Sequence, residues 1–262
     1  MNDRPDVATS TEGRDLGSAK GQTPQARWIS EPQAAALLHR YGIAYPDHEF
    51  ANDVAQAVAA ATRIGYPVVM KVVSEQIVHK SDVGGVIVGL ANERALRRGF
   101  RTLHERMRAN APATVLDGVL IASQAPAGLE LIIGGHRDAM FGPVVAAGLG
   151  GTLVEVLGDV ALRLAPLTAR DARAMIDETK LANLLAGSRG SPALDRSAVE
   201  QLLLAVSDLL VAESDVIELD LNPVRAYETR CLALDVRLGV ASTLGSTAAP
   251  AGRGGGPACR TS

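Results

Sequence analysis

The sequence predicts a mixed fold of the α+β (α/β) class, and three observations support this prediction. Short apolar runs of strand length, such as Val68–Val73 and Gly118–Ser123, stand between longer stretches whose apolar residues recur at helical spacing. The two kinds of stretch do not alternate strictly, and the sequence shows no internal repeat. Aromatic residues make up 3% of the chain, whereas hydrophobic residues make up 47%. The core must therefore be built mainly from Ala, Val, Leu and Ile.

The first helix and the strand and helix after it are predicted from local signals. Ser30 and Gln33 form a capping-box pattern at the start of the first helix. A weak strand follows at 45–51. Asn52 is predicted to cap the second helix, and a glycine ends each of the two helices. The chain then enters its most apolar strand, at Val68–Val73.

The remaining elements follow from the same kinds of pattern. Capping residues mark the helix starts, and helical or alternating spacing of apolar residues distinguishes helices from strands. The predicted elements are a charged helix from Asn92 to Met107, strands at 118–123, 129–134 and 142–147, a helix from Thr168 to 185, and a helix at 195–214. The many arginines of the charged helix are expected to face solvent.

The composition changes near both ends of the chain. Residues 1–27 and 244–262 are rich in small, polar and charged residues and contain very few large apolar side chains. Such segments cannot bury enough apolar surface to compensate for the entropy lost on ordering. We therefore expect two disordered tails that flank one folded domain at 28–243.

The overall charge and hydropathy argue against several classes of protein. A net charge of −3 offers no broad basic surface for nucleic acid. The polar, charged N-terminus does not resemble a secretory signal. The most apolar region, 144–167, is interrupted by Glu155, Asp159 and Arg163, so it is not expected to cross a membrane. The two cysteines lack metal-ligand spacing. We expect a cytoplasmic protein that binds neither nucleic acid nor membranes.

The stretch 68–90 carries the first chemical signal. Lys71 lies inside an apolar, β-branched run, where a lysine either extends to solvent or binds an anion. The loop after it contains His79 and then Gly84 and Gly85, which could form a bulge or let backbone amides approach phosphate oxygens. The sequence contains neither the P-loop nor the dinucleotide glycine motif. The stretch indicates a nucleotide phosphate site, with a solvent-facing lysine and a surface histidine as the alternatives.

A predicted hairpin near the C-terminus carries the second signal. Two strand-like segments of alternating polarity flank Glu228 and Thr229, and a reversal at these residues sets Asn222 directly opposite Asp235. An amide oxygen and a carboxylate could then bind one ion. Mg²⁺ takes few protein ligands and completes its shell with water and phosphate oxygens, so this pair suits a Mg²⁺–nucleotide site. The alternative is the exposed polar face of an edge hairpin.

Several segments together resemble one protein family. Residues 71–86 are similar to the nucleotide-binding segment of the ATP-grasp domain in NDP-forming acyl-CoA synthetases, such as acetate–CoA ligase (ADP-forming), which are related to the succinyl-CoA synthetase β subunit. The other matching motifs are LELIIGG at 129–135, FGPVV at 141–145, GLGG at 148–151, GxRG at 187–190 and ELDLNP at 218–223, and Ser188 departs from the aromatic residue that the family often has there. The resemblance covers about 28–240 and implies an ATP-grasp fold, in which two subdomains clasp a nucleotide.

The resemblance also implies roles for individual residues. The strand lysine contacts the nucleotide phosphates, a short hinge borders the adenine, and an acid supports the nucleotide. The residues that resemble these nucleotide-binding positions are Lys71, Gly84, Gly85, Ser123, Gln124, Ala125 and Glu130. Asn222 and Asp235 resemble the pair that holds Mg²⁺. His79 resembles the second phosphorylatable histidine, a catalytic relay between the nucleotide and a phosphohistidine on the partner subunit.

The implied activity is that of an acid–thiol ligase, which interconverts acyl-CoA + ADP + phosphate with carboxylate + CoA + ATP. With ATP or ADP and Mg²⁺ as cofactors, this chain would carry out the phosphoryl-transfer half, which requires positioning and charge neutralisation. The 262 residues contain no CoA-binding or ligase domain, so an α-type CoA-binding/ligase subunit is the expected partner, and it would bring the small carboxylic acid and CoA. Two alternatives remain: a non-catalytic adenine-nucleotide sensor, and an ATP-grasp carboxylate–amine ligase that forms an acylphosphate.

Overall fold

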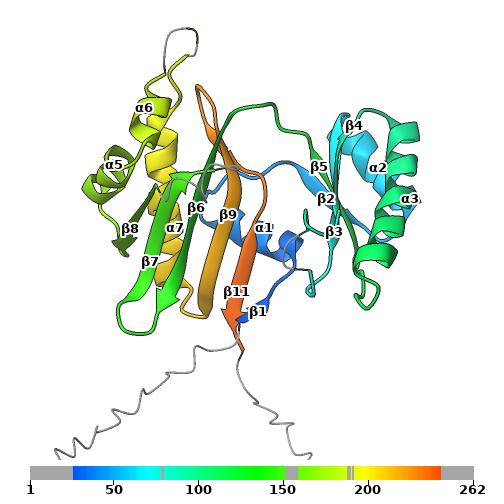
Figure 1. Cartoon of the computed structure of the whole chain (residues 1–262), viewed down its shortest axis with the longest axis horizontal. Helices are drawn as coiled ribbons and strands as arrows, with labels where there is room; N and C mark the ends of the chain where they lie inside the picture. The colour runs from blue at the N-terminus through cyan, green and yellow to red at the C-terminus, as the bar shows by residue number, and fades with distance from the viewer. Residues whose placement is uncertain (1–25, 78–79, 151–158, 188–189, 191, 243–262) are drawn as a thin grey trace, which may run out of the picture.

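The computed structural model of this chain describes residues 26–77, 80–150, 159–187, 190 and 192–242. These residues form two lobes that lie side by side, each built around its own sheet (Figure 1). The predicted tails lie outside the described residues, apart from residues 26 and 27. The mixed α and β fold with two subdomains is confirmed.

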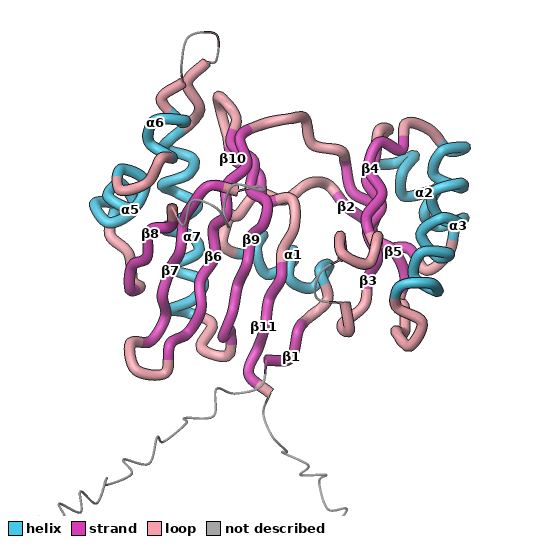
Figure 2. Tube along the Cα trace, in the orientation of Figure 1, coloured by secondary structure: helices cyan, strands magenta, loops and turns pink. Residues whose placement is uncertain are grey.

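The larger lobe contains a seven-stranded sheet, which is antiparallel at every pairing. Its strand order is β1-β11-β9-β6-β7-β8, and β10 pairs with β9 near one end of the sheet (Figure 2). The strands are β1 (Ala26–Trp28), β6 (Leu129–Asp138), β7 (Gly142–Leu149), β8 (Val160–Leu164), β9 (Val216–Ala226), β10 (Cys231–Ala233) and β11 (Arg237–Ala241). The described residues of this lobe form the helices α1 (Glu31–Arg40), α5 (Ala169–Asp177), α6 (Leu181–Leu185) and α7 (Arg196–Ala212).

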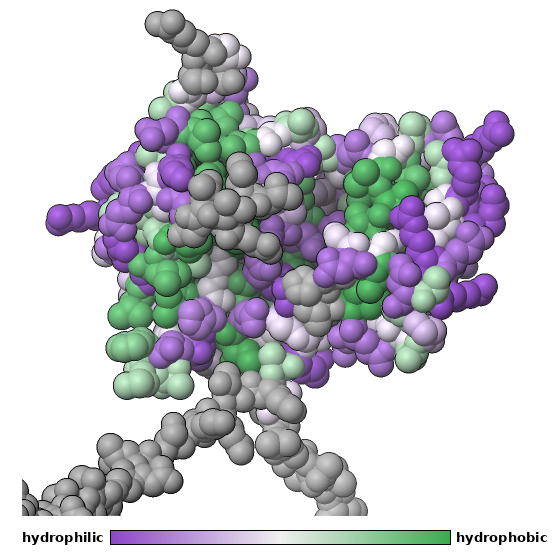
Figure 3. Space-filling model, in the orientation of Figure 1, coloured by the Kyte–Doolittle hydropathy of each residue, from purple (hydrophilic) through white to green (hydrophobic). Residues whose placement is uncertain are grey.

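The smaller lobe contains a four-stranded antiparallel sheet of order β2-β5-β3-β4. Its strands are β2 (His48–Ala51), β3 (Val68–Val73), β4 (Val86–Leu90) and β5 (Gly118–Ser123), and its helices are α2 (Val54–Ile64) and α3 (Glu93–Asn110). Both helices lie on the face of the sheet that points away from the larger lobe (Figure 1). The outer surface of α3 is hydrophilic, as its sequence predicts (Figure 3).

The two lobes have separate hydrophobic cores. Residues of β6, β7, β9 and α7, such as Ile133 and Leu203, form the larger core. Residues of β3, β5, α2 and α3, such as Met70 and Leu103, form the smaller one. Helix α1 belongs to the larger core although it precedes the small lobe in the chain, because its apolar face, including Leu38, packs there. The first turn of α1 therefore lies where the two lobes meet.

The structure confirms several predicted elements. The strands at Val68–Val73 and Gly118–Ser123 have the predicted bounds. Gln33 accepts a hydrogen bond from the backbone nitrogen of Ser30 at 3.3 Å, as the capping box predicts. Asn92 caps α3 through a hydrogen bond from the Ala95 nitrogen. The helices of the described residues include none long and apolar enough to cross a bilayer.

Two predicted boundaries are wrong. Residues 26 and 27 were expected to belong to the N-terminal tail but pair with β11, and the neighbouring Trp28 ring lies 4.6 Å from the guanidinium of Arg237. With this contact beside it, strand β1 begins the folded domain at residue 26, two residues before the start that composition suggests. Helix α2 is capped by Asp53 instead of Asn52, because the Asp53 carboxylate accepts hydrogen bonds from the nitrogens of Ala55 and Gln56.

Two further elements differ from expectation. The predicted helix from Thr168 to 185 is divided into α5 and α6, because the Thr179 hydroxyl donates to the Ile176 carbonyl and Asp159 accepts from the Lys180 nitrogen. Strand β8 was not predicted. It lies at the sheet edge with its large apolar residues exposed and Ala161 buried, which is the reverse of the usual alternation.

Candidate nucleotide site

A cavity of about 320 Å³ lies at the junction of the two lobes. Six of the predicted site residues line it: Lys71, Ser123, Gln124, Ala125, Asn222 and Asp235. Apolar side chains, among them Val69 and Val88, form another part of the wall. A cavity with apolar walls and a few charged or amide groups is typical of a small-ligand site. Sequence positions more than 160 residues apart therefore meet at one place.

Lys71 is not a solvent-facing lysine. Alternation along β3 directs Val68, Met70 and Val72 into the small core, whereas Val69 and Lys71 face the cavity. The ammonium nitrogen of Lys71 lies 2.6 Å from Glu31 Oε1 and 3.1 Å from Asp235 Oδ1. It also donates to the Leu234 carbonyl at 2.5 Å. The alternative of an extended surface lysine is therefore excluded.

A second lysine shares the same carboxylates. Lys80 Nζ lies 3.3 Å from Asp235 Oδ1 and 3.0 Å from Glu31 Oε2, the latter contact lacking the direction of a hydrogen bond. Glu31 is the first residue of α1 and is almost fully buried. Burial alone raises the pKa of Glu31, but the positive charges of Lys71 and Lys80 outweigh it and bring this pKa to about 2. Glu31 is therefore ionised at neutral pH.

The neighbouring groups respond to the same charges. Burial alone lowers the pKa of Lys71, but the carboxylates of Glu31 and Asp235 raise it above its usual value. Burial raises the pKa of Asp235, and the Glu31 carboxylate adds to this against the opposing effect of the lysines. Tyr45, whose hydroxyl donates to Glu31, has a raised pKa because it is buried near two carboxylates. The cavity thus has a charged, largely dehydrated end.

The predicted hairpin is confirmed. Cys231 pairs with Ala226 and Ala233 with Val224, and the Tyr227 nitrogen donates to the Arg230 carbonyl across the turn. The reversal therefore occurs at 228 and 229. The Leu234 nitrogen donates to the Pro223 carbonyl at 2.9 Å, so the same register continues to the pair 223 and 234. Further along, Arg237 pairs with Asp220 in this register, which sets Asn222 opposite Asp235.

The donor set of Asn222 and Asp235 suits Mg²⁺. Both residues line the cavity, and they offer one amide oxygen and one carboxylate. Among the described residues there is no group of three or more His, Cys, Asp or Glu side chains that could hold a metal ion. A sparse pair is what Mg²⁺ uses when phosphate oxygens and water complete its shell. Asp235 is held by two lysines in this structure, so a cation would have to replace ammonium contacts.

The hinge segment forms the side of the cavity next to the small lobe. The Ser123 nitrogen donates to Asp47 O and the Gln124 nitrogen to Pro67 O, which fixes this backbone at the end of β5. The guanidinium of Arg225, on β9, donates to the Ala125 carbonyl at 3.3 Å and to the Pro126 carbonyl at 2.8 Å. The hinge is therefore held by both lobes.

Three predicted residues lie outside the wall of the cavity. Glu130 forms an ion pair at 2.9 Å with Arg225, which does line the cavity. The amides of Gly84 and Gly85 donate to the carbonyls of Ser81 and Lys80, so both close their own loop in this structure. A side chain at Gly85 would meet a Val72 methyl at 2.5 Å, which explains the need for glycine there. Phosphate contact by these glycines stays a prediction.

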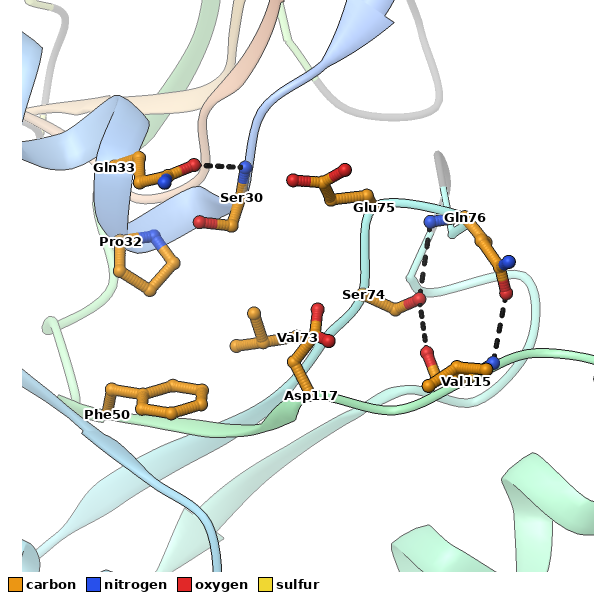
Figure 4. Close-up of a pocket in the computed structure, with 10 residues that line it drawn as sticks. All are labelled: Ser30, Pro32, Gln33, Phe50, Val73, Ser74, Glu75, Gln76, Val115 and Asp117. Carbon is orange, nitrogen blue, oxygen red and sulfur yellow. Dashed lines mark hydrogen bonds between the residues drawn. The ribbon is translucent and has the colours of Figure 1, made fainter. Parts of the chain in front are cut away.

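A larger hollow of about 550 Å³ lies between the start of α1, the end of β3 and the start of β5 (Figure 4). Its wall includes Glu75 and Asp117, and none of its described lining residues is Lys, Arg or His. The Ser74 hydroxyl donates to the Val115 carbonyl, and Gln76 accepts from the Val115 nitrogen, so these polar groups bond to the wall itself. An acidic wall repels phosphate, so the smaller cavity, which Lys71 lines, is the better candidate for a phosphate-bearing ligand.

The sequence did not indicate every residue of the site. The sequence pattern gives no signal for Glu31, Tyr45 or Arg225. A glutamate in a first helical turn, such as Glu31, usually interacts only with the helix dipole. Lys80 stands in the polar loop that the sequence singled out, but it was given no role. His79 lies outside the described residues, and its predicted role as a relay is not tested by this structure.

Residues 21–240 match the ATP-grasp domain family. The chain belongs to the ATP-grasp family. It is 42% identical over 212 residues to the β subunit of acetate–CoA ligase (ADP-forming) I of Pyrococcus furiosus, a match that covers 81% of this ATP-grasp chain and 91% of the relative. The 4-hydroxybutyrate–CoA ligase (ADP-forming) of Nitrosopumilus maritimus is 41% identical over 214 residues, but this match covers only 31% of that longer protein.

Solved structures agree with this assignment. The dinucleotide-forming acetyl-coenzyme A synthetase 1 of Candidatus Korarchaeum cryptofilum, in complex with coenzyme A, Ca-AMPCP and HgCl⁺, has a TM-score of 0.80 and 41% identity to this ATP-grasp chain. The match covers 82% of this chain and 93% of that one. Another structure of that synthetase, with coenzyme A and Mg-AMPPCP, has its phosphohistidine segment pointing towards the nucleotide binding site and a TM-score of 0.71.

Proposed function

We propose that this ATP-grasp chain is the nucleotide-binding, β-type component of an ADP-forming acyl-CoA synthetase, an acid–thiol ligase. The observation that carries the proposal is the cavity between the lobes, where Lys71 lies beside Asn222 and Asp235. The match along 91% of a relative named as a β subunit supports a role for this chain as a separate subunit. The complete reaction would interconvert acyl-CoA + ADP + phosphate with carboxylate + CoA + ATP.

Each part of the cavity has a role in this proposal. The segment 123–125 borders the adenine, with the apolar wall against the base. Lys71 binds the phosphates as a fixed positive charge. Asn222 and Asp235 hold Mg²⁺, which when bound neutralises the charge on the phosphate oxygens. Such preorganised charges contribute most of the catalysis in phosphoryl transfer.

His79 is the proposed acceptor of the phosphoryl group. A neutral imidazole nitrogen attacks the γ-phosphorus of ATP, the bond between phosphorus and the bridging oxygen breaks, and ADP leaves with its electrons. The reverse step forms ATP from ADP and the phosphorylated histidine. An unperturbed imidazole is partly neutral near pH 7, which permits both directions.

An α-type CoA-binding/ligase subunit completes the proposed enzyme. It would bind CoA and the small carboxylic acid and exchange phosphoryl groups with His79 through a phosphohistidine of its own. The β-subunit name of the Pyrococcus relative and the phosphohistidine segment named for the synthetase structure support this arrangement. A cytoplasmic location is part of the proposal, because the nucleotide and CoA substrates are held there.

Incubation with γ-labelled ATP and Mg²⁺ tests the relay. Acid-labile phosphate should form on the wild type and on the control variant His39→Ala, an exposed histidine of α1, but not on His79→Ala. Label that survives His79→Ala would contradict the relay. Nucleotide binding without labelling or turnover, even with a co-purified CoA-binding subunit, would indicate a sensor. A hydroxylamine-sensitive acylphosphate formed without the partner would indicate a carboxylate–amine ligase.

A further inference from the structure

Four charged side chains meet at the junction of the lobes, three of them buried and the fourth partly exposed. They are Glu31 of α1, Lys71 of β3, Lys80 of the following loop, and Asp235 next to the hairpin. The Glu31 side chain is 1% exposed and each lysine side chain is 9% exposed. The two positive and two negative charges balance. Buried charges are tolerated only when they are paired, so each member depends on the others.

The two carboxylates of this cluster differ in position. Glu31 is fixed, because α1 packs into the larger core and both Lys71 and the Tyr45 hydroxyl bond to its Oε1 atom. It is not among the residues that line the nucleotide cavity. Asp235 lines the cavity and its side chain is 27% exposed. Only Asp235 can therefore reach both the lysines and a ligand.

The lysines and the metal compete for Asp235. Its Oδ1 atom lies 3.1 Å from Lys71 Nζ and 3.3 Å from Lys80 Nζ, so the carboxylate is engaged by two ammonium groups. When Asp235 binds a cation, the lysines lose one of their two counter-charges. Glu31 remains paired with both lysines, because opposite charges about 3 Å apart interact strongly in a poorly hydrated site. Its negative charge offsets part of the positive charge of the lysines, so they hold Asp235 less strongly.

We propose that Glu31 is a positioning residue that retains Lys71 and Lys80 and thereby frees Asp235 to bind Mg²⁺ with the nucleotide. The inference rests on the proposed function, since it assumes that the cavity binds Mg²⁺–ADP. It assigns to Glu31 a role that requires no contact with the nucleotide or the metal. It also assigns to Lys80 a share in controlling the metal affinity of the site.

The quantity that tests this role is the Mg²⁺ enhancement, the ratio of the ADP dissociation constant without Mg²⁺ to that with Mg²⁺, measured by calorimetry on the full chain. In Glu31→Gln the enhancement should fall about tenfold or more, since both ammonium groups then depend on Asp235 alone. In Glu31→Gln/Lys80→Gln the charges balance again, and most of the enhancement should return. The control Glu75→Gln, which changes an exposed acid near α1, should leave it unchanged.

The single variant Lys80→Gln should change the Mg²⁺ enhancement in the opposite direction to Glu31→Gln. It therefore tests the inference even if Glu31→Gln does not fold. It removes one competitor for Asp235, so the enhancement should rise. The inference is overturned if the enhancement is unchanged in Glu31→Gln, if the double variant is no better than Glu31→Gln, or if Lys80→Gln lowers it. Failure of the wild type to bind ADP with or without Mg²⁺ is a different result, because it overturns the proposed function itself.

Discussion

At the scale of single residues, Arg225 connects the two halves of the candidate site. It lies on β9 three residues after Asn222, and its guanidinium donates to the hinge carbonyl of Ala125, to the adjacent carbonyl of Pro126 and to Glu130. The hinge borders the proposed adenine position, and the same strand carries a proposed metal ligand. One side chain therefore connects the segment at the proposed adenine position to the strand that carries the proposed metal ligand.

We predict that Arg225→Ala weakens ADP binding by about tenfold, because the expected loss of hinge positioning is about that of one charge-assisted hydrogen bond, roughly 1.5 kcal/mol. Calorimetric titration of ADP measures the loss. The matched control is Arg230→Ala, because Arg230 lies on the same hairpin but stacks on the exposed side of Tyr227 and does not line the cavity. Equal affinities of the two variants would contradict the role of Arg225.

Residue-level prediction from the sequence succeeded where short-range pattern was sufficient. The register of the hairpin follows from alternation and one turn, so Asn222 and Asp235 could be paired before the fold was seen. Lys71 stood out because a charge interrupts an apolar strand. Glu31 could not be connected to Lys71, because 40 residues separate them and the contact exists only once the two lobes are assembled.

At the scale of secondary structure, the start of α2 shows how neighbouring polar residues can be confused. Asn52 and Asp53 are both good N-cap residues, and the sequence offers little to choose between them. The structure places Asp53 in an extended conformation with its carboxylate 2.8 Å from two backbone nitrogens. Asn52 instead donates its own backbone nitrogen to the Gln56 side chain.

Asp53→Ala should therefore destabilise the protein by about 1 kcal/mol, the typical cost of losing an N-cap. Asn52→Ala should change stability by less than about 0.5 kcal/mol, as an exposed substitution usually does. Urea unfolding at neutral pH, followed by circular dichroism, measures both variants. A larger loss for Asn52→Ala than for Asp53→Ala would show that the helix begins one residue earlier.

At the scale of the whole molecule, the two lobes keep separate cores and meet through polar and charged contacts. Helix α1 packs in the larger core, yet its Glu31 binds a lysine of the small sheet. The hinge is bound from one side by Asp47 and Pro67 and from the other by Arg225. The junction thus includes several buried or partly buried charged groups. A charged ligand that enters the junction would compete for these contacts from both lobes.

A nucleotide bound at this junction should reduce local opening of the backbone in both lobes. We predict that Mg²⁺–ADP slows amide hydrogen exchange in β4, in the hinge at 123–125 and in the hairpin at 222–235, because all three border the cavity. Exchange around 74–76 and 115–117, which border the acidic hollow, should change much less. The two regions provide an internal comparison within one chain. Protection confined to the acidic hollow would assign the nucleotide to the larger space, whereas protection of one lobe alone would show that the nucleotide does not bridge the two sheets.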